Sequence, residues 1–295
     1  MQPFTRPIPP AVQTTLALPE QHIYYRIYRP QTAAAPRRLL LLHGGGVGGE
    51  LTWGAIISQL RHWSEILVPD LRGAGDTRHP SGKERGFEAE AVAADITALL
   101  QHLHWENIDL GGYSFGGLVA MLLKARRGEQ VNKTYLIEAA LLGRMTPEET
   151  IASRDRMLHA AKKLRIREQT EEGLEIFLDV VSPNRTRGSK SEAIARERLS
   201  RRPVGLACAV ECVSHASRRI DRSALIAAQA HVSSFIGERS HPQLYGLCQN
   251  LAAQRDDWRC HLIQGADHAL PFKKPYAIAR LMNEDLMHHL TEKNN

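Results

Sequence analysis

One serine in the sequence is surrounded by glycines, at the point where an apolar run gives way to a helical pattern. Residues 108–121 read IDLGGYSFGGLVAM, which places Ser114 at the centre of a Gly-x-Ser-x-Gly motif. Glycine weakens the interior of strands and helices, so four glycines at such a junction indicate a tight turn with close backbone packing. A serine hydroxyl raised above a sheet by such a turn could attack a carbonyl carbon if a base takes its proton.

The elements that must position this serine alternate between strands and helices. Buried strand patterns occur in RRLLLL, EILVPD, NIDLGGYS, VNKTYLIEA, HVSSFIG and WRCHLIQG, and helical patterns occur over 51–63, 88–104 and 116–127. Continuous apolar runs of this length are typical of strands buried on both faces of a parallel sheet. Two earlier strand patterns, 14–18 and 22–28, predict a hairpin. We therefore predict an α/β protein with a mostly parallel central sheet flanked by helices.

The alternation stops after the strand VNKTYLIEA. Between residues 143 and 228 only charged helical patterns occur, and strand patterns resume afterwards. The sequence therefore predicts a core formed by residues 1–142 and 229–295, with a helical insertion over 143–228.

Three motifs, in this order, resemble those of the α/β-hydrolase fold superfamily, in its serine hydrolase, esterase-like branch. They are LLLLHGGGVGG over 39–49, the Ser114 turn, and LIQGADHALPF over 262–272; VPDLRGAGDT over 68–77 also resembles a loop of such enzymes. The resemblance covers nearly the whole chain outside the insertion, which it implies to be a helical cap domain. A nucleotide-binding glycine turn is the alternative, but GGYSFGG lacks Gly-x-Gly-x-x-Gly and HGGGVGG lacks the acidic context that binds a ribose.

The resemblance implies roles for several positions. Ser114 would be the nucleophile, and His268, just after the last strand pattern, would be its base. The oxyanion hole would consist of the backbone N–H groups of Phe115 and Gly45, with Gly46 as the next choice for the second donor. His43 would shape the glycine loop.

The acid of the catalytic triad departs from the usual pattern. Similar enzymes carry an aspartate three residues after the glycine that ends the seventh strand, and here Ser240 stands at that position. Glu138, at the end of the preceding strand, is our preferred replacement, because strand ends at that edge of a sheet face the same crevice. Glu238 is the rival, on the usual loop but two residues early. Asp267 is a weaker candidate, since it would have difficulty reaching the ring of its own neighbour, His268.

Composition limits the remaining functions. The chain has 43% apolar and 24% charged residues and lacks an apolar stretch long enough to span a membrane, which is typical of a soluble globular protein. The N-terminus lacks the apolar segment of a secretion signal, so we expect a cytoplasmic protein. We expect free thiols and no metal site from the scattered cysteines, which are Cys208, Cys212, Cys248 and Cys260.

The positive charge is concentrated in the insertion. Between residues 144 and 222 there are 17 Lys or Arg and 12 Asp or Glu, which accounts for +5 of the net charge of +6. The two signs are interleaved, as on solvated helices, so we do not expect nucleic-acid binding. The excess of arginine raises the hypothesis of an anionic substrate, although a soluble surface is the explanation that we favour.

The sequence therefore predicts a cofactor-independent hydrolase that cleaves a carboxylic ester or thioester of a small molecule through an acyl-enzyme. The same triad could serve an acyltransferase or a hydrolase of carbon–carbon bonds, and the absent aspartate leaves open a non-catalytic small-molecule receptor. We expect a monomer or a homodimer.

Overall fold

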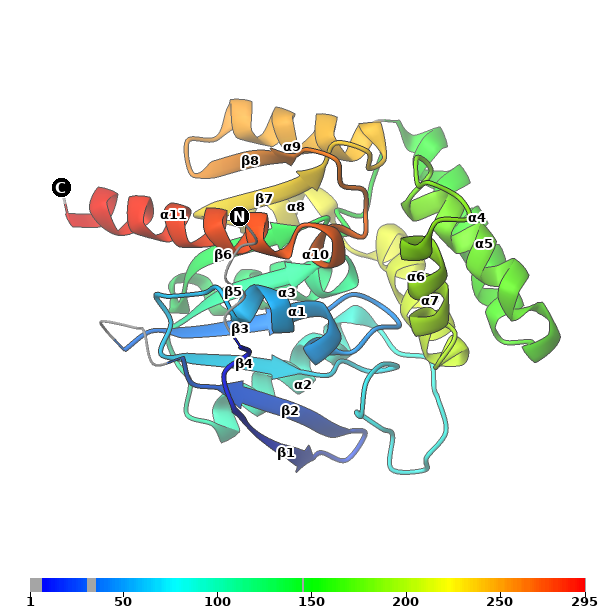
Figure 1. The fold of residues 1–295 in the computed structure, drawn as a ribbon, viewed down its shortest axis with the longest axis horizontal. Coiled ribbons are helices and arrows are strands. Elements are labelled where there is room, and N and C mark those ends of the chain that lie inside the picture. The colour runs from blue at the N-terminus through cyan, green and yellow to red at the C-terminus, as the bar shows by residue number, and fades with distance from the viewer. Residues whose placement is uncertain (1–6, 31–35, 145, 295) are drawn as a thin grey trace.

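The computed structural model describes residues 7–30, 36–144 and 146–294. Its centre is one eight-stranded sheet with the strand order β1-β2-β4-β3-β5-β6-β7-β8 (Figure 1). β2 runs antiparallel to its neighbours β1 and β4, and all other neighbours are parallel. The strands are β1 (Ala11–Ala17), β2 (His22–Tyr28), β3 (Arg38–Leu42), β4 (Glu65–Pro69), β5 (Ile108–Tyr113), β6 (Val131–Ile137), β7 (Val232–Gly237) and β8 (Trp258–Ile263).

Helices cover both faces of the sheet. One face packs against α1 (Gly49–Ile57), α10 (Leu270–Lys273) and α11 (Pro275–Asn294). The other packs against α2 (Ala89–His102), α3 (Phe115–Arg127), α8 (Arg222–Ala227) and α9 (Pro242–Gln254), and the short turn η1 (Gly128–Gln130) follows α3. The predicted α/β architecture with a mostly parallel sheet is confirmed.

The apolar runs form strands because both of their faces are covered. The four leucines of β3, Leu39 to Leu42, are all 0% exposed and alternate between the two core clusters. A helix in this position could not bury all of them, whereas a central parallel strand must. The predicted hairpin also forms, with β1 and β2 paired from Ala11 and Tyr28 to Ala17 and His22.

One helix is shorter than predicted. The pattern over 51–63 predicts a helix to residue 63, but α1 ends at Ile57. The hydroxyl of Ser58 donates to the carbonyl of Ala55 (2.8 Å), and the chain then leaves the helix. Trp63 enters the core instead, with its indole N–H donating to Asp109 (2.7 Å). A buried hydrogen-bonded tryptophan thus outweighs the helical periodicity.

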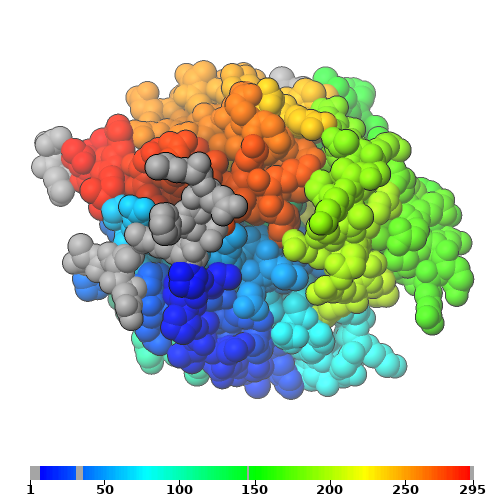
Figure 2. Space-filling view, in the orientation of Figure 1, coloured from blue at the N-terminus to red at the C-terminus, as the bar shows by residue number. Residues whose placement is uncertain are grey.

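Four helices between β6 and β7, here termed the inserted helices, lie beyond the carboxyl ends of the strands (Figure 1). In the space-filling view they form a continuous flank beside the core (Figure 2). α8 follows them but packs on α3, with Leu225 and Ile226 in the same core cluster. The inserted helices are α4 (Pro147–Leu164), α5 (Thr170–Val181), α6 (Lys190–Leu199) and α7 (Pro203–Arg219), with a short turn η2 (Arg167–Gln169) before α5.

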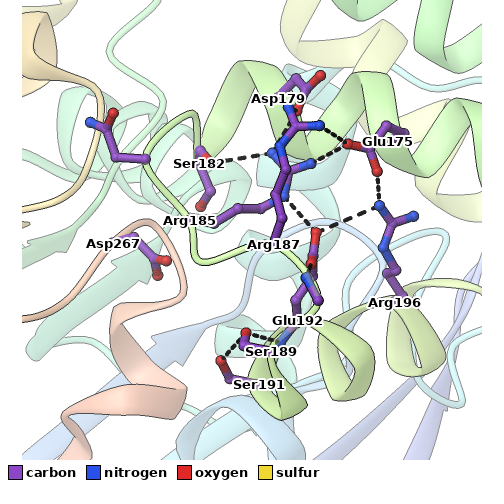
Figure 3. Close-up of polar contacts among 12 residues, drawn as sticks. Glu175, Asp179, Ser182, Arg185, Arg187, Ser189, Ser191, Glu192, Arg196 and Asp267 are labelled. Carbon is purple, nitrogen blue, oxygen red and sulfur yellow. Dashed lines mark hydrogen bonds and ion pairs between the residues drawn. The ribbon is translucent and has the colours of Figure 1, made fainter.

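An ion-pair network joins α5 to α6 (Figure 3). Arg185, in the connection between them, donates to Glu175 (2.5 Å), Asp179 (2.6 Å) and Glu192 (2.7 Å). Arg196 of α6 also pairs with Glu175 and, at 3.5 Å, with Glu192. The side chains of Arg185 and Glu192 are 4% and 7% exposed, so this pair is largely removed from water. The network therefore ties the connection to both helices.

None of the described helices combines the length and the apolar character that crossing a bilayer requires. The four cysteines lie within the described residues and are free thiols, three of them buried.

Candidate active site

Ser114 lies in the sharp turn between β5 and α3. Its backbone has φ 51° and ψ −117°, a conformation that L-residues rarely adopt. Its N–H donates to the carbonyl of Ile137 (3.0 Å) on β6, which holds the strained turn. Such strain persists only where the surrounding structure enforces it, and it is frequent at functional sites.

The flanking glycines permit this turn. A Cβ at Gly112 would lie 2.5 Å from the carbonyl oxygen of Gly116, and a Cβ at Gly116 would lie 2.4 Å from the carbonyl oxygen of Leu42. Both distances are far below van der Waals contact with backbone that cannot move aside. Glycine at these positions is therefore required for α3 to pass so close to the strands.

His268 reaches Ser114 from the loop after β8. The ring Nε2 lies 3.1 Å from the Ser114 Oγ. The backbone is held from the other side, because the hydroxyl of Tyr113 donates to the His268 carbonyl (2.9 Å) and the two rings pack with centroids 5.4 Å apart. The sheet thus brings together two residues that are 154 positions apart in the chain.

Glu138 completes the chain of hydrogen bonds. It follows β6 in a left-handed conformation (φ 47°) and is 1% exposed. Its Oε2 lies 3.1 Å from the Nδ1 of His268, and its Oε1 accepts from the N–H of Gly237 (2.6 Å) and the hydroxyl of Ser240 (2.6 Å). A carboxylate beside Nδ1 favours the imidazole tautomer whose proton is on Nδ1. The lone pair of Nε2 then faces the serine hydroxyl.

The other acids lie elsewhere. Glu238 is exposed and accepts from the N–H of Gly265 (2.9 Å). Asp267 is buried but pairs with the ammonium of Lys273 (2.6 Å). Among the three predicted carboxylates, Glu138 is the one that contacts His268.

The glycine loop after β3 is held by two buried polar side chains. His43 donates from Nδ1 to the carbonyl of Gly44 (2.6 Å) and accepts at Nε2 from the N–H of Leu71 (2.7 Å). Burial lowers the pKa of His43, so the neutral ring that these two bonds require is the stable form. Asp70 accepts from the N–H of Gly49 (2.7 Å) and fixes the far end of the loop.

The candidate oxyanion donors differ in where they lie. Phe115 is the first residue of α3, so its N–H has no carbonyl of the helix to bond. Gly45 lines the cavity above Ser114. Gly46 has φ 79°, and a Cβ there would meet Leu199 and Leu206 of the inserted helices. This placement favours Gly45 over Gly46 as the second donor.

A cavity of about 330 Å³ lies above these residues, between the core and the inserted helices. Much of its lining is apolar, and the larger apolar side chains are Val47, Phe115, Leu141, Leu142, Met157, Phe177, Leu178, Val180, Val181, Ile194, Leu199, Leu206, Val210, Val213, Leu244 and Phe272. Enclosed, largely apolar cavities with a few converging polar groups are typical of small-molecule sites. In the described residues, no cluster of three or more histidine, cysteine or acidic side chains is arranged to hold a metal ion.

Comparison with known proteins identifies the fold. A sequence model described as alpha/beta hydrolase fold matches residues 37–170. The crystal structure of a putative lipase from Acinetobacter baumannii superposes with a TM-score of 0.73 over 96% of this chain and 93% of that chain, at 14% identity. The chain has the α/β-hydrolase fold. At such low identity the structural likeness establishes the fold alone.

The curated relatives of this α/β-hydrolase-fold protein carry different reactions in their names. A soluble epoxide hydrolase from Corynebacterium is 29% identical over 107 residues, which is 36% of each chain. A 2-hydroxy-6-oxo-2,4-heptadienoate hydrolase from Pseudomonas putida is 29% identical over 103 residues, or 34% of this chain and 37% of the relative. The chain thus matches little more than a third of the length of these relatives.

Two side chains of this site are not predicted from the sequence. Tyr113 occupies the variable position before Ser114, and nothing in the sequence indicates that its hydroxyl reaches His268. Ser240 stands where the resemblance predicts the acid, so its position carried a signal. Ser240 is not the acid itself: its hydroxyl donates a hydrogen bond to the acid, Glu138.

Proposed function

We propose that this protein hydrolyses a carboxylic ester or thioester of a small molecule through an acyl-enzyme on Ser114. The observation that carries the proposal is the continuous chain from the Ser114 Oγ to His268 and on to Glu138, with 3.1 Å at each step. It lies at the floor of a cavity that the inserted helices, acting as a cap, close from above.

The first half-reaction forms the acyl-enzyme. His268 Nε2 takes the Ser114 proton as Oγ bonds to the carbonyl carbon, and the buried carboxylate of Glu138 stabilises the charged ring. The N–H groups of Phe115 and Gly45 donate to the oxyanion. His268 then protonates the departing alcohol or thiol as its bond to carbon breaks. In the second half, water attacks in the same way and releases the acid and the free serine.

The serine favours acyl chemistry over epoxide opening, although one relative is named as an epoxide hydrolase. Attack by Ser114 on an epoxide would leave an ether, which has no carbonyl for water to attack. An acyl-serine is an ester and can be hydrolysed. The nucleophile at position 114 therefore favours carbonyl substrates.

A second candidate is hydrolysis of a carbon–carbon bond next to a ketone. The relative named 2-hydroxy-6-oxo-2,4-heptadienoate hydrolase favours this candidate. Such a reaction would use the same three residues, with a carbanion as the leaving group. Acyl transfer to an alcohol would also use them, with the alcohol in place of water.

A panel of p-nitrophenyl esters and acyl thioesters of increasing chain length, together with a β-diketone, tests the proposal. We expect ester or thioester hydrolysis that falls by roughly 10⁵-fold in Ser114→Ala and by about 10³-fold in Glu138→Gln. Glu238→Gln is the matched control, because Glu238 is exposed and does not contact His268, and it should keep wild-type rates. Turnover of the diketone alone would replace ester hydrolysis by the second candidate, and turnover of no compound would favour a receptor.

A further inference from the structure

Most arginines of the inserted helices are paired with carboxylates. Arg185, Arg196 and Arg202 each lie in ion pairs with acidic side chains. Two arginines that line the cavity are exceptions to this pairing. Arg144 and Arg198 have no carboxylate within ion-pair distance among the described residues. The excess positive charge of the insertion is thus partly directed into the cavity.

Arg144 is the less solvated of these two. It lies between β6 and α4, and burial lowers the pKa of its guanidinium. Its side chain makes one long hydrogen bond, from Nη1 to the carbonyl of Gly143 (3.4 Å). Glu149 is close enough to influence it, but its carboxylate is directed to Thr146, accepting from the backbone N–H (3.2 Å) and the hydroxyl (3.3 Å). Among the described residues, most of the five N–H donors of Arg144 therefore have no protein acceptor.

His241 approaches the same region from the start of α9. It lines the cavity, and its Nδ1 is sealed from water without a hydrogen-bond partner. Burial and the neighbouring charge of Arg144 lower the pKa of His241. Arg144 and His241 are thus neighbours in the cavity lining, and the described lining contains one acid, Glu138, which is already bonded to His268.

Arg144 is half-buried in the cavity wall and has lost part of its hydration without gaining a carboxylate, so a ligand that supplies an acceptor there would stabilise its charge. We propose that Arg144 and His241 bind a terminal carboxylate on the acyl chain of the substrate, so that the preferred substrates are monoesters or monothioesters of dicarboxylic acids. This inference rests on the proposed ester hydrolysis at Ser114. The carboxylate matches the planar fork of arginine.

The apolar lining accommodates the methylene chain between the two ends. An acyl chain remains attached to Ser114 through both half-reactions, so a charge on it contributes to binding throughout, unlike a charge on the leaving group. Arg144 follows Glu138 by six residues, so the two lie at most about 20 Å apart. This upper bound includes every chain length from succinic to suberic acid, so the length that fits best is determined by the panel below.

The test compares p-nitrophenyl monoesters of dicarboxylic acids from succinic to suberic acid with their methyl-capped, neutral counterparts of the same length. The leaving group is the same throughout. We expect wild-type kcat/KM to favour at least one charged ester by roughly 10-fold or more. The ratio of charged to neutral rates should collapse towards one in Arg144→Gln and be partly retained in Arg144→Lys. Arg156→Gln, an exposed arginine outside the cavity, is the control and should keep the ratio.

A binding measurement separates this inference from the proposed function. The dicarboxylate that matches the best ester should raise the melting temperature of Ser114→Ala more than the monocarboxylate of equal length, and addition of Arg144→Gln should abolish the difference. Hydrolysis of neutral and charged esters at equal rates, without this shift, would overturn the carboxylate site and leave the proposed function standing. A shift without hydrolysis of any ester would support the site and overturn the hydrolase.

Discussion

The carboxylate that faces His268 comes from the end of β6, and Ser240, at the position where the resemblance predicts an aspartate, holds it. The Ser240 hydroxyl and the Gly237 N–H both donate to Oε1 of Glu138, each at 2.6 Å. Oε2 is thereby left for the imidazole. Compared with the pattern that the resemblance predicts, the acid lies at the end of β6 instead of after β7, and a serine that donates to it lies after β7. We call this difference the exchange.

This exchange predicts a rescue. Glu138→Gln should lose most activity, and Ser240→Asp in the same chain should restore it at least about 10-fold, because a carboxylate then returns to the vicinity of Nδ1. Initial rates with the best ester of the panel measure the effect. Ser240→Asn in the Glu138→Gln background is the uncharged control and should restore nothing. If the double variant with Ser240→Asp folds but is as inactive as Glu138→Gln alone, the exchange is refuted.

Among the elements, the inserted helices depend on charge as well as on apolar packing. Arg185 lies among Glu175, Asp179 and Glu192, and the carboxylate of Glu192 is only 7% exposed (Figure 3). Ser182, in the same connection, lines the cavity. The network therefore links the conformation of this connection to the shape of the site.

Replacing the central arginine should destabilise these helices. Arg185→Met removes the buried cation that three carboxylates share and leaves the buried Glu192 with only the longer pair to Arg196 (3.5 Å) among the described residues, so we expect a loss of about 3 kcal/mol in the free energy of unfolding. Urea denaturation followed by circular dichroism measures it. Arg201→Met removes an exposed pair with Glu197 (side chains 59% and 61% exposed) and should cost less than about 0.5 kcal/mol. Equal effects of the two substitutions would contradict a structural role of the network.

For the molecule as a whole, one buried lysine makes stability depend on pH. Lys133 of β6 is 4% exposed, and burial lowers its pKa from 10.5 to about 8, although Asp285 favours its charged form. Between these two pH values the unfolded chain binds a proton at this position that the folded chain does not. The contribution of Lys133 to stability therefore rises with pH from about 8 to 10.5.

Lys133→Met removes this dependence. The variant should be more stable than wild type at pH 7, by an amount on the order of 3 kcal/mol, and the difference should shrink as the pH approaches 10.5. Denaturation curves of both proteins across this pH range give the difference, in which all other titrations cancel. Lys83→Met, at an exposed position, should show no such trend. A difference independent of pH would show that the ammonium is not destabilised by burial.

The sequence was sufficient for those features that depend on local pattern. The strands follow from apolar runs such as the leucines of β3, and the turn at Ser114 follows from Gly112 and Gly116, since a Cβ at either glycine would meet backbone. The adjacency of Ser114 and His268 follows from the order of strands in this fold, which the resemblance supplied.

The remaining features depend on packing between distant segments. The contact between Glu138 and His268 depends on the left-handed backbone at Glu138 and on the neighbouring β7. The hydrophobic periodicity of the sequence predicts neither of these features. Trp63 lies outside the helix that its periodicity predicts, because its hydrogen-bond partner, Asp109, lies on β5. Composition likewise could not show that Arg185 is paired with carboxylates whereas Arg144 is not, since both lie in the same basic stretch.

The most direct test of the account is covalent labelling of the serine. Incubation with a fluorophosphonate, followed by intact-mass and peptide analysis, should add one phosphonyl group, located on Ser114. Labelling should be absent in Ser114→Ala and at least about 100-fold slower in His268→Ala, because the imidazole must take the proton. Equal labelling of wild type and Ser114→Ala, or a label on any other residue, would contradict a nucleophile at position 114.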